Sequence, residues 1–200
     1  MINQFAIAIT TIIFNKTALS IAGDYGVSAV SIIMYMQFLF LGIYNGYSQG
    51  LVPLLSQEYG HHHYQKRCDY QRDSYYFFII VPILSCVISY LSSDVLVSFF
   101  AQIDHPVYSI ATHGMKLYSL TYICAGLNIF TAYYFSAFGY GHYGFWITLL
   151  RPLVLLMIFL LILPHHLGMN GLWLATPMAE MFTCFITIIM NIYINKTLYK

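Results

Sequence analysis

The segment from Pro152 to Pro164 contains only apolar residues, and it is one of several such segments along this chain. An α-helix needs about 20 mainly apolar residues to cross the hydrocarbon layer of a membrane. A transmembrane barrel strand instead alternates polar and apolar residues over about ten positions, and these segments do not alternate. The long apolar segments therefore predict membrane-spanning helices.

The charge content supports lipid as the main solvent. Only 8% of the 200 residues are Asp, Glu, Lys or Arg, whereas 60% are hydrophobic. A soluble domain carries about 25% charged residues. Backbone groups in lipid must form their hydrogen bonds inside the protein, as they do in helices. The expected fold class is an all-α membrane protein.

Turn-forming residues divide the chain into six predicted spans. The breaks include Gly23 to Gly26 and the polar segment from Gly60 to Asp73. The predicted spans, which form one transmembrane lobe over residues 1–200, are 3–22, 28–50, 74–92, 110–136, 144–164 and 171–194.

Six spans place both termini on the same side of the membrane, and the loop charges predict which side. The basic residues of one face are Lys66, Arg67, Arg72, Lys196 and Lys200. The loops of the opposite face carry Asp24, Asp94 and Asp104 instead. Because cytoplasmic loops are enriched in Lys and Arg, we expect a plasma-membrane protein with both termini in the cytoplasm.

Polar residues recur at helical spacing on several predicted spans. Polar groups are costly in lipid and therefore tend to face the interior of the bundle. Asn45, Gln49 and Asn128 are candidates to line a cavity, and Tyr134 is a candidate to stack on a flat or cationic ligand. The alternative is that such stripes hold neighbouring helices together.

Three ionisable residues fall within or near the predicted spans: Glu180, Arg151 and Lys116. Glu180 is the only carboxylate placed well inside a span. It is a candidate to bind a proton, a cation or a cationic substrate, and alternatively to pair with Arg151 as a structural lock.

Glycines recur at every fourth position in the second span, at Gly42, Gly46 and Gly50, and Pro53 follows them. Such spacing forms a groove that lets another helix approach closely, while proline bends or ends a helix. The pattern predicts either close helix packing or a moving hinge.

The remaining residues predict no metal site, cofactor or disulfide, and no enzyme active site. The histidine clusters 61–63 and 165–166 fall on opposite sides of the predicted membrane, roughly 30 Å apart. The four cysteines lack pairing or metal-ligand spacing. The sequence has no basic patch to hold a phosphate backbone, so we expect no nucleic-acid partner.

Four sequence patterns, in order along the chain, resemble multidrug and toxic compound extrusion (MATE) transporters. The first runs from Gly42 to Tyr59-Gly60 and resembles the family's eighth helix, with Val52-Pro53 where Gln-Pro is common. The others resemble the tenth, eleventh and twelfth helices, and they are Gly126 to Ile129 with Tyr134 to Gly139, Arg151-Pro152, and Gly168 to Glu180.

The resemblance implies the C-terminal six-helix lobe of a twelve-helix antiporter, truncated and inactive alone. Such transporters export small cationic or amphipathic substrates in exchange for Na+ or H+, and both lobes enclose the pathway. The expected partners are therefore membrane lipid, the missing N-terminal lobe or a second copy, and a substrate. Ion-binding carboxylates known from one branch of the family are absent from the corresponding spans here, which leaves the coupling site open.

Two alternatives remain. One is half of a related lipid-linked precursor flippase, for which Lys16, Lys116 and Arg151 are the candidate cations. The other is a non-transporting membrane remnant or subunit.

Overall fold

The computed structural model describes residues 2–61 and 63–198, and the side chains of residues 5–61 and 63–193. Every regular element in this part of the chain is a helix, which confirms the all-α class. The elements are α1 (Ile2–Gly60), α2 (Tyr64–Leu91), α3 (Ser93–Ser98), α4 (Pro106–Tyr118), α5 (Thr121–Ala137), α6 (Gly141–Leu149), the π-helical turn η1 (Leu150–Leu155), α7 (Leu156–Leu167) and α8 (Met169–Leu198). His62, Lys200 and the side chain of Lys196 lie outside the described residues.

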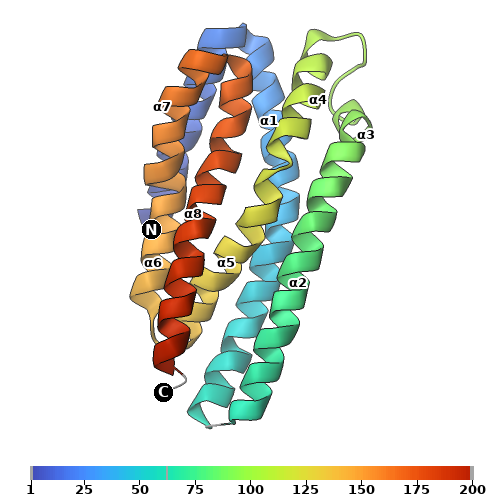
Figure 1. Cartoon of the computed structure of the whole chain (residues 1–200). Coiled ribbons are helices and arrows are strands. Elements are labelled where there is room, and N and C mark those ends of the chain that lie inside the picture. Colours follow the sequence, from blue (N-terminus) through green and yellow to red (C-terminus); the bar gives the residue numbers. More distant parts are fainter. Residues whose placement is uncertain (1, 62, 199–200) are drawn as a thin grey trace.

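The long helix α1 consists of two limbs that meet at Gly23. Gly23 has φ 61° and ψ −151°, which breaks the helix, and the chain reverses direction there (Figure 1). Glycine adopts positive φ without the steric penalty of a Cβ atom. The break falls within the turn predicted at Gly23 to Gly26.

The second limb of α1 continues well beyond the predicted end at residue 50. Pro53 lies inside the helix, which runs to Gly60, so the helix does not end at Pro53. Leu51 and Leu55 flank Pro53 and are buried in the hydrophobic core. Their packing outweighs the roughly 3 kcal/mol that an internal proline costs a helix.

The predicted span 110–136 is divided into α4 and α5 at Ser119. The Ser119 hydroxyl donates to the carbonyl of Lys116 at 2.7 Å, and the amide of Tyr122 donates to the carbonyl of Ser119 at 3.1 Å. This tighter turn ends one helix and starts the next. The two helices follow each other end to end along the bundle (Figure 1).

Within the described residues, four helical segments are long and apolar enough to cross a membrane. They are Phe5–Gly60, Tyr64–Leu91, Gly141–Leu167 and Met169–Tyr193. Apolar side chains on these segments remain exposed, including Ile80 on α2 and Leu161 on α7. Such surfaces suit a lipid environment.

Two hydrophobic clusters form the core. The first contains Ile33, Met115 and Trp173, and the second contains Phe78 and Phe130 together with further aromatic residues of α1 and α5. Along α8, Leu172, Trp173 and Ala175 belong to the first cluster, and Met190 packs against the second. The α8 residues between these positions include buried polar side chains, which belong to the site described below.

The glycines predicted to pack closely do not do so within this chain. A Cβ atom on Gly42, Gly46 or Gly50 would meet no atom within 4 Å, so the packing interpretation is wrong for the lobe alone. These glycines lie on an exposed face of the second limb of α1. Close approach occurs elsewhere, because a Cβ on Gly114 would lie 2.6 Å from Cε2 of Trp173.

The substitution Gly114→Ala is expected to destabilise the protein by about 1–3 kcal/mol, because the added methyl group overpacks the first cluster. Gly46→Ala is the matched control, and it is expected to leave stability unchanged or raise it by about 0.5–1 kcal/mol through helix propensity. The free energy of unfolding is measured by titrating detergent-solubilised protein with SDS. Equal effects of the two substitutions would contradict this packing.

Candidate functional site

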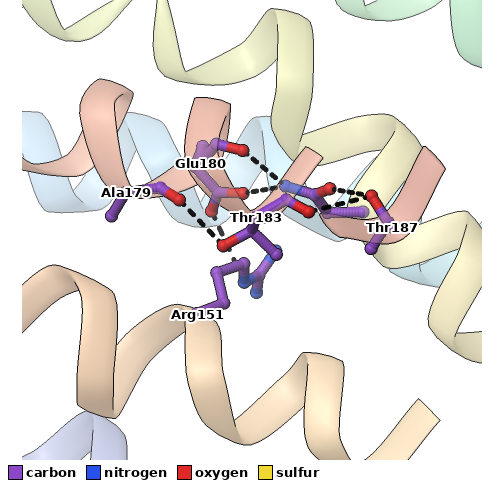
Figure 2. A network of polar contacts seen from close by, with 6 residues as sticks. Arg151, Ala179, Glu180, Thr183 and Thr187 are labelled. Atoms are coloured by element: carbon purple, nitrogen blue, oxygen red, sulfur yellow. Dashed lines mark hydrogen bonds and ion pairs between the residues drawn. The ribbon is translucent and has the colours of Figure 1, made fainter. Parts of the chain in front are cut away.

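A buried ion pair links the π-helical turn to α8. The Nε atom of Arg151 lies 3.4 Å from Oε1 of Glu180, and Glu180 is 4% exposed. Figure 2 shows the guanidinium group beside the inward side of α8. The pairing that sequence analysis offered as a structural lock is thus present in the structure.

Asn128 of α5 completes this cluster and joins it to α8. Its amide nitrogen donates to Oε2 of Glu180 at 2.7 Å and to the backbone carbonyl of Glu180 at 2.9 Å. Its carbonyl oxygen accepts a hydrogen bond from the hydroxyl of Thr187 at 2.9 Å. Asn128 is 1% exposed. We call Asn128, Arg151, Glu180 and Thr187 the polar cluster.

The backbone around Arg151 has a local cause for its unusual geometry. Pro152 follows Arg151, and a proline inside an α-helix clashes with the carbonyl four residues earlier. The turn of Leu150–Leu155 is π-helical, and such a wider turn relieves this clash. Isolated π-helical turns occur frequently at functional sites. This turn presents Arg151 to α8.

A cavity of about 340 Å³ lies beside the polar cluster. It is bounded by the second limb of α1, α5, α6 and η1. Its lining residues are Asn45, Asn128, Ile129, Ala132, Tyr133, Ser136, Gly141, Gly144, Phe145, Ile147, Thr148 and Arg151. In its wall, the Asn45 amide donates to the carbonyl of Leu41 on the same helix at 2.8 Å, and the Tyr133 hydroxyl of α5 lies 3.5 Å from Oδ1 of Asn45. Arg151 lines two cavities, and we call this one, the bigger of those two, the larger cavity.

A smaller cavity of about 160 Å³ lies between the two limbs of α1, η1 and α8. Thr10, Gln37, Arg151 and Glu180 are among the residues that line it. Arg151 therefore borders both cavities, whereas Glu180 borders only the smaller one. The ion pair stands where the two cavities approach each other.

The structure brings together some of the predicted site residues. Asn45, Asn128 and Arg151 meet at the larger cavity. Gln49 is exposed and lines neither cavity. Lys116, in the last turn of α4, lies 3.4 Å from Oδ2 of Asp94 and lines neither cavity.

Tyr134 is placed differently from the prediction. It is 1% exposed, and its ring lies 4.7 Å from that of Phe138 and 5.6 Å from that of Phe130. It belongs to the second hydrophobic cluster and lines neither cavity. The preceding residue, Tyr133, faces the cavity instead.

Several residues of the larger cavity were not predicted. Ala132 and Ser136 follow Asn128 at intervals of four, so they share its helical face, and this spacing was a usable signal. Thr148 and Gly144 lie on α6. The sequence of this span is so uniformly apolar that it does not indicate which face points inward. The hydroxyl of Thr148 donates to the carbonyls of Gly144 and Phe145, which masks its polarity.

Among the described residues, no group of three or more His, Cys, Asp or Glu side chains is placed to hold a metal ion. His61 and His63 lie at the junction of α1 and α2, whereas His165 and His166 end α7. Figure 1 shows these two positions at opposite ends of the bundle.

Comparisons with known proteins agree with this architecture. The family model described as MatE matches residues 1–162. A crystal structure of MATE in complex with MaL6 matches with a TM-score of 0.90 and 15% identity, over 99% of this chain and 45% of that chain. An outward-facing multidrug resistance MATE family transporter of the MOP superfamily matches with a TM-score of 0.88 and 16% identity, over 98% of this chain and 44% of that one.

A MOP superfamily transporter from Pyrococcus furiosus matches with a TM-score of 0.88 and 15% identity, over 99% of this chain and 45% of that chain. That protein is described as having a binding pocket of reverse polarity, which suggests a different function for it. None of the curated proteins compared with this sequence matches it.

The fold and the enclosed polar site define a helical membrane bundle that corresponds to one half of a transporter. The chain spans less than half the length of the solved structures it matches. It belongs to the MatE family of transporters, which confirms the resemblance seen in the sequence.

The substitution Asn128→Ala is expected to destabilise the lobe, because it leaves Oε2 of Glu180 without the donor that Asn128 supplies. Each buried group left unsatisfied costs about 1–3 kcal/mol. Asn45→Ala is the control, since the Asn45 amide donates to a carbonyl of its own helix, and its expected cost is below about 1 kcal/mol. Titration with SDS measures both variants. A larger loss for Asn45→Ala would contradict the described network.

Proposed function

We propose that this chain is the C-terminal lobe of a cation-coupled multidrug efflux antiporter for small amphipathic compounds. The observation that carries the proposal is the larger cavity, where Asn45, Asn128 and Arg151 converge among apolar side chains. Ligand sites are commonly concave and mostly apolar, with a few placed polar groups, and span roughly 300–1,000 Å³. The larger cavity fits the lower end of that range.

The proposed transport pathway needs a second lobe, either the N-terminal lobe or a second copy of this chain. The second limb of α1 exposes Gly42, Gly46 and Gly50, together with Phe38 and Ile43. Small residues in an exposed helical face allow another helix to approach closely inside a membrane. The same glycines and Pro53 are the proposed hinge when the lobes move.

We place the lobe in the plasma membrane with both termini in the cytoplasm. The junction of α1 and α2 carries Lys66 and Arg72, both exposed. Asp94 and Asp104 lie toward the opposite end of α2, near α3 and the start of α4. The positive-inside rule assigns the Lys66 end to the cytoplasm.

Transport in this proposal needs no cofactor and no enzymatic step. The coupling ion is Na+ or H+, and Glu180 is the carboxylate of this lobe that faces the bundle interior. Its ion pair with Arg151 means that a bound cation has to replace an existing partner.

The alternative function, lipid-linked precursor flipping, receives less support from the charges. A pyrophosphate headgroup calls for several cations, and among the residues lining the larger cavity only Arg151 is charged. Lys116 is paired with Asp94 at another part of the lobe, and Lys16 is exposed on the first limb of α1.

The test is efflux of ethidium from cells that express this chain alone or fused behind the N-terminal lobe of a MATE transporter of known structure. The chain alone is expected to give background efflux, and the paired lobes are expected to export ethidium when a Na+ or proton gradient is present. Efflux by the isolated chain, or gradient-independent efflux by the pair, would contradict the proposal.

Asn45→Leu provides a test within the paired protein. It places a larger apolar group in the cavity wall, so efflux is expected to fall several-fold while expression is unchanged. Gln57→Leu is the matched control, because Gln57 is an exposed residue of the same helix outside the cavity.

A further inference from the structure

The charge that borders the larger cavity is positive. Arg151 is the one ionisable side chain of strong charge among its lining residues, and no carboxylate lines it. Glu180 lies on the other side of Arg151 and contributes to the smaller cavity. Its two carboxylate oxygens are already engaged, one by Arg151 and the other by Asn128. A cation in the larger cavity would therefore meet Arg151 first, with the carboxylate of Glu180 behind it on the far side of the guanidinium group.

The guanidinium group of Arg151 has unused donor capacity. It contacts Glu180 through Nε at 3.4 Å, which is not the two-point geometry of a strong arginine–carboxylate pair. Its Nη1 atom is buried and has no hydrogen-bond acceptor. A buried donor without a partner is unfavourable. Because Arg151 also lines the larger cavity, a shift of the guanidinium group toward a ligand with an anionic oxygen would satisfy this donor.

Two other polar groups of the cavity wall also have hydrogens to donate to an anionic ligand. The hydroxyl of Tyr133 lies 3.5 Å from Oδ1 of Asn45, a long contact that is easily exchanged for a shorter one. The Asn45 amide uses one contact, to the carbonyl of Leu41, and an amide nitrogen has two hydrogens to donate. Phe145 and Ile129 supply apolar wall beside these donors.

We propose that the larger cavity binds a small amphipathic carboxylate, whose anionic end engages Arg151 while its apolar body lies against Phe145 and Ile129. Naming this ligand a transport substrate rests on the proposed function, whereas the binding itself does not. Because Glu180 holds the same guanidinium group, the ligand and Glu180 compete for Arg151.

The experiment is equilibrium dialysis of radiolabelled benzoate against the purified chain in detergent, with empty micelles as the blank. Benzylamine and benzyl alcohol are the competitors, since they present a similar ring with a positive or a neutral polar group. Saturable benzoate binding that neither competitor displaces is the expected result. Stronger binding of benzylamine than of benzoate would overturn the inference.

Variants identify the group responsible. Arg151→Gln is expected to weaken benzoate binding about tenfold or more, as loss of a charge-assisted hydrogen bond implies, and Arg151→Lys is expected to weaken it less. Lys116→Gln is the matched control, because it removes a cation that is paired with Asp94 outside the cavity. Its affinity is expected to equal that of the unaltered chain.

Glu180→Gln tests whether Arg151 binds the ligand directly or only supports the fold. It removes the competitor for Arg151, so benzoate is expected to bind several-fold more tightly, whereas a purely structural role predicts weaker binding. Unchanged or weaker binding in Glu180→Gln, or unchanged binding in Arg151→Gln, would contradict the inference.

The two proposals fail separately. Ion-driven efflux by the paired lobes without benzoate binding to this chain would refute the carboxylate site alone. Benzoate binding without efflux by the paired lobes would refute the proposed function alone.

Discussion

The contact between Arg151 and Glu180 governs how this lobe is arranged around its interior. Charges removed from water are costly unless they are paired and hydrogen-bonded. The pair here is completed by Asn128, which also binds the backbone of α8. A helix carrying a half-buried arginine and a helix carrying a buried glutamate are thereby fixed against each other. The two cavities meet at this pair, so the same interaction supports the fold and borders the space proposed for ligands.

The fold class and most helix positions follow directly from the sequence, since long apolar segments leave few structural choices in lipid. The breaks were harder to predict. Gly23 was a usable signal, because glycine readily adopts the positive φ at which this helix breaks. Pro53 was a poor signal for the end of a helix. Leu51 and Leu55 on either side of it are buried in the core, and their packing outweighs the tendency of proline to end a helix. The boundary between α4 and α5 at Ser119 is formed by hydrogen bonds of the Ser119 side chain and backbone, which the pattern of apolar residues does not indicate.

The site was predictable to the extent that polarity in lipid is informative. Asn45 and Asn128 stood out as amides on apolar helices, and Arg151 was the obvious partner for Glu180. Tyr134 and its neighbour Tyr133 are distinguishable only by the rotation of α5, which packing sets. The glycines of α1 show a limit of another kind, because among the described residues no atom would meet a Cβ atom added to Gly42, Gly46 or Gly50. The spacing alone does not show whether such a face meets another helix or lipid.

The most direct test of this account is a double-mutant cycle for Arg151→Met and Glu180→Leu, with the free energy of unfolding measured by SDS titration. Removing either partner is expected to cost about 3–5 kcal/mol, because it leaves one buried charge without compensation. The double variant is expected to lose less than the sum of the single losses, with a coupling of about 1–3 kcal/mol. Additive losses, or single variants as stable as the unaltered chain, would show that the two helices are not held by this pair.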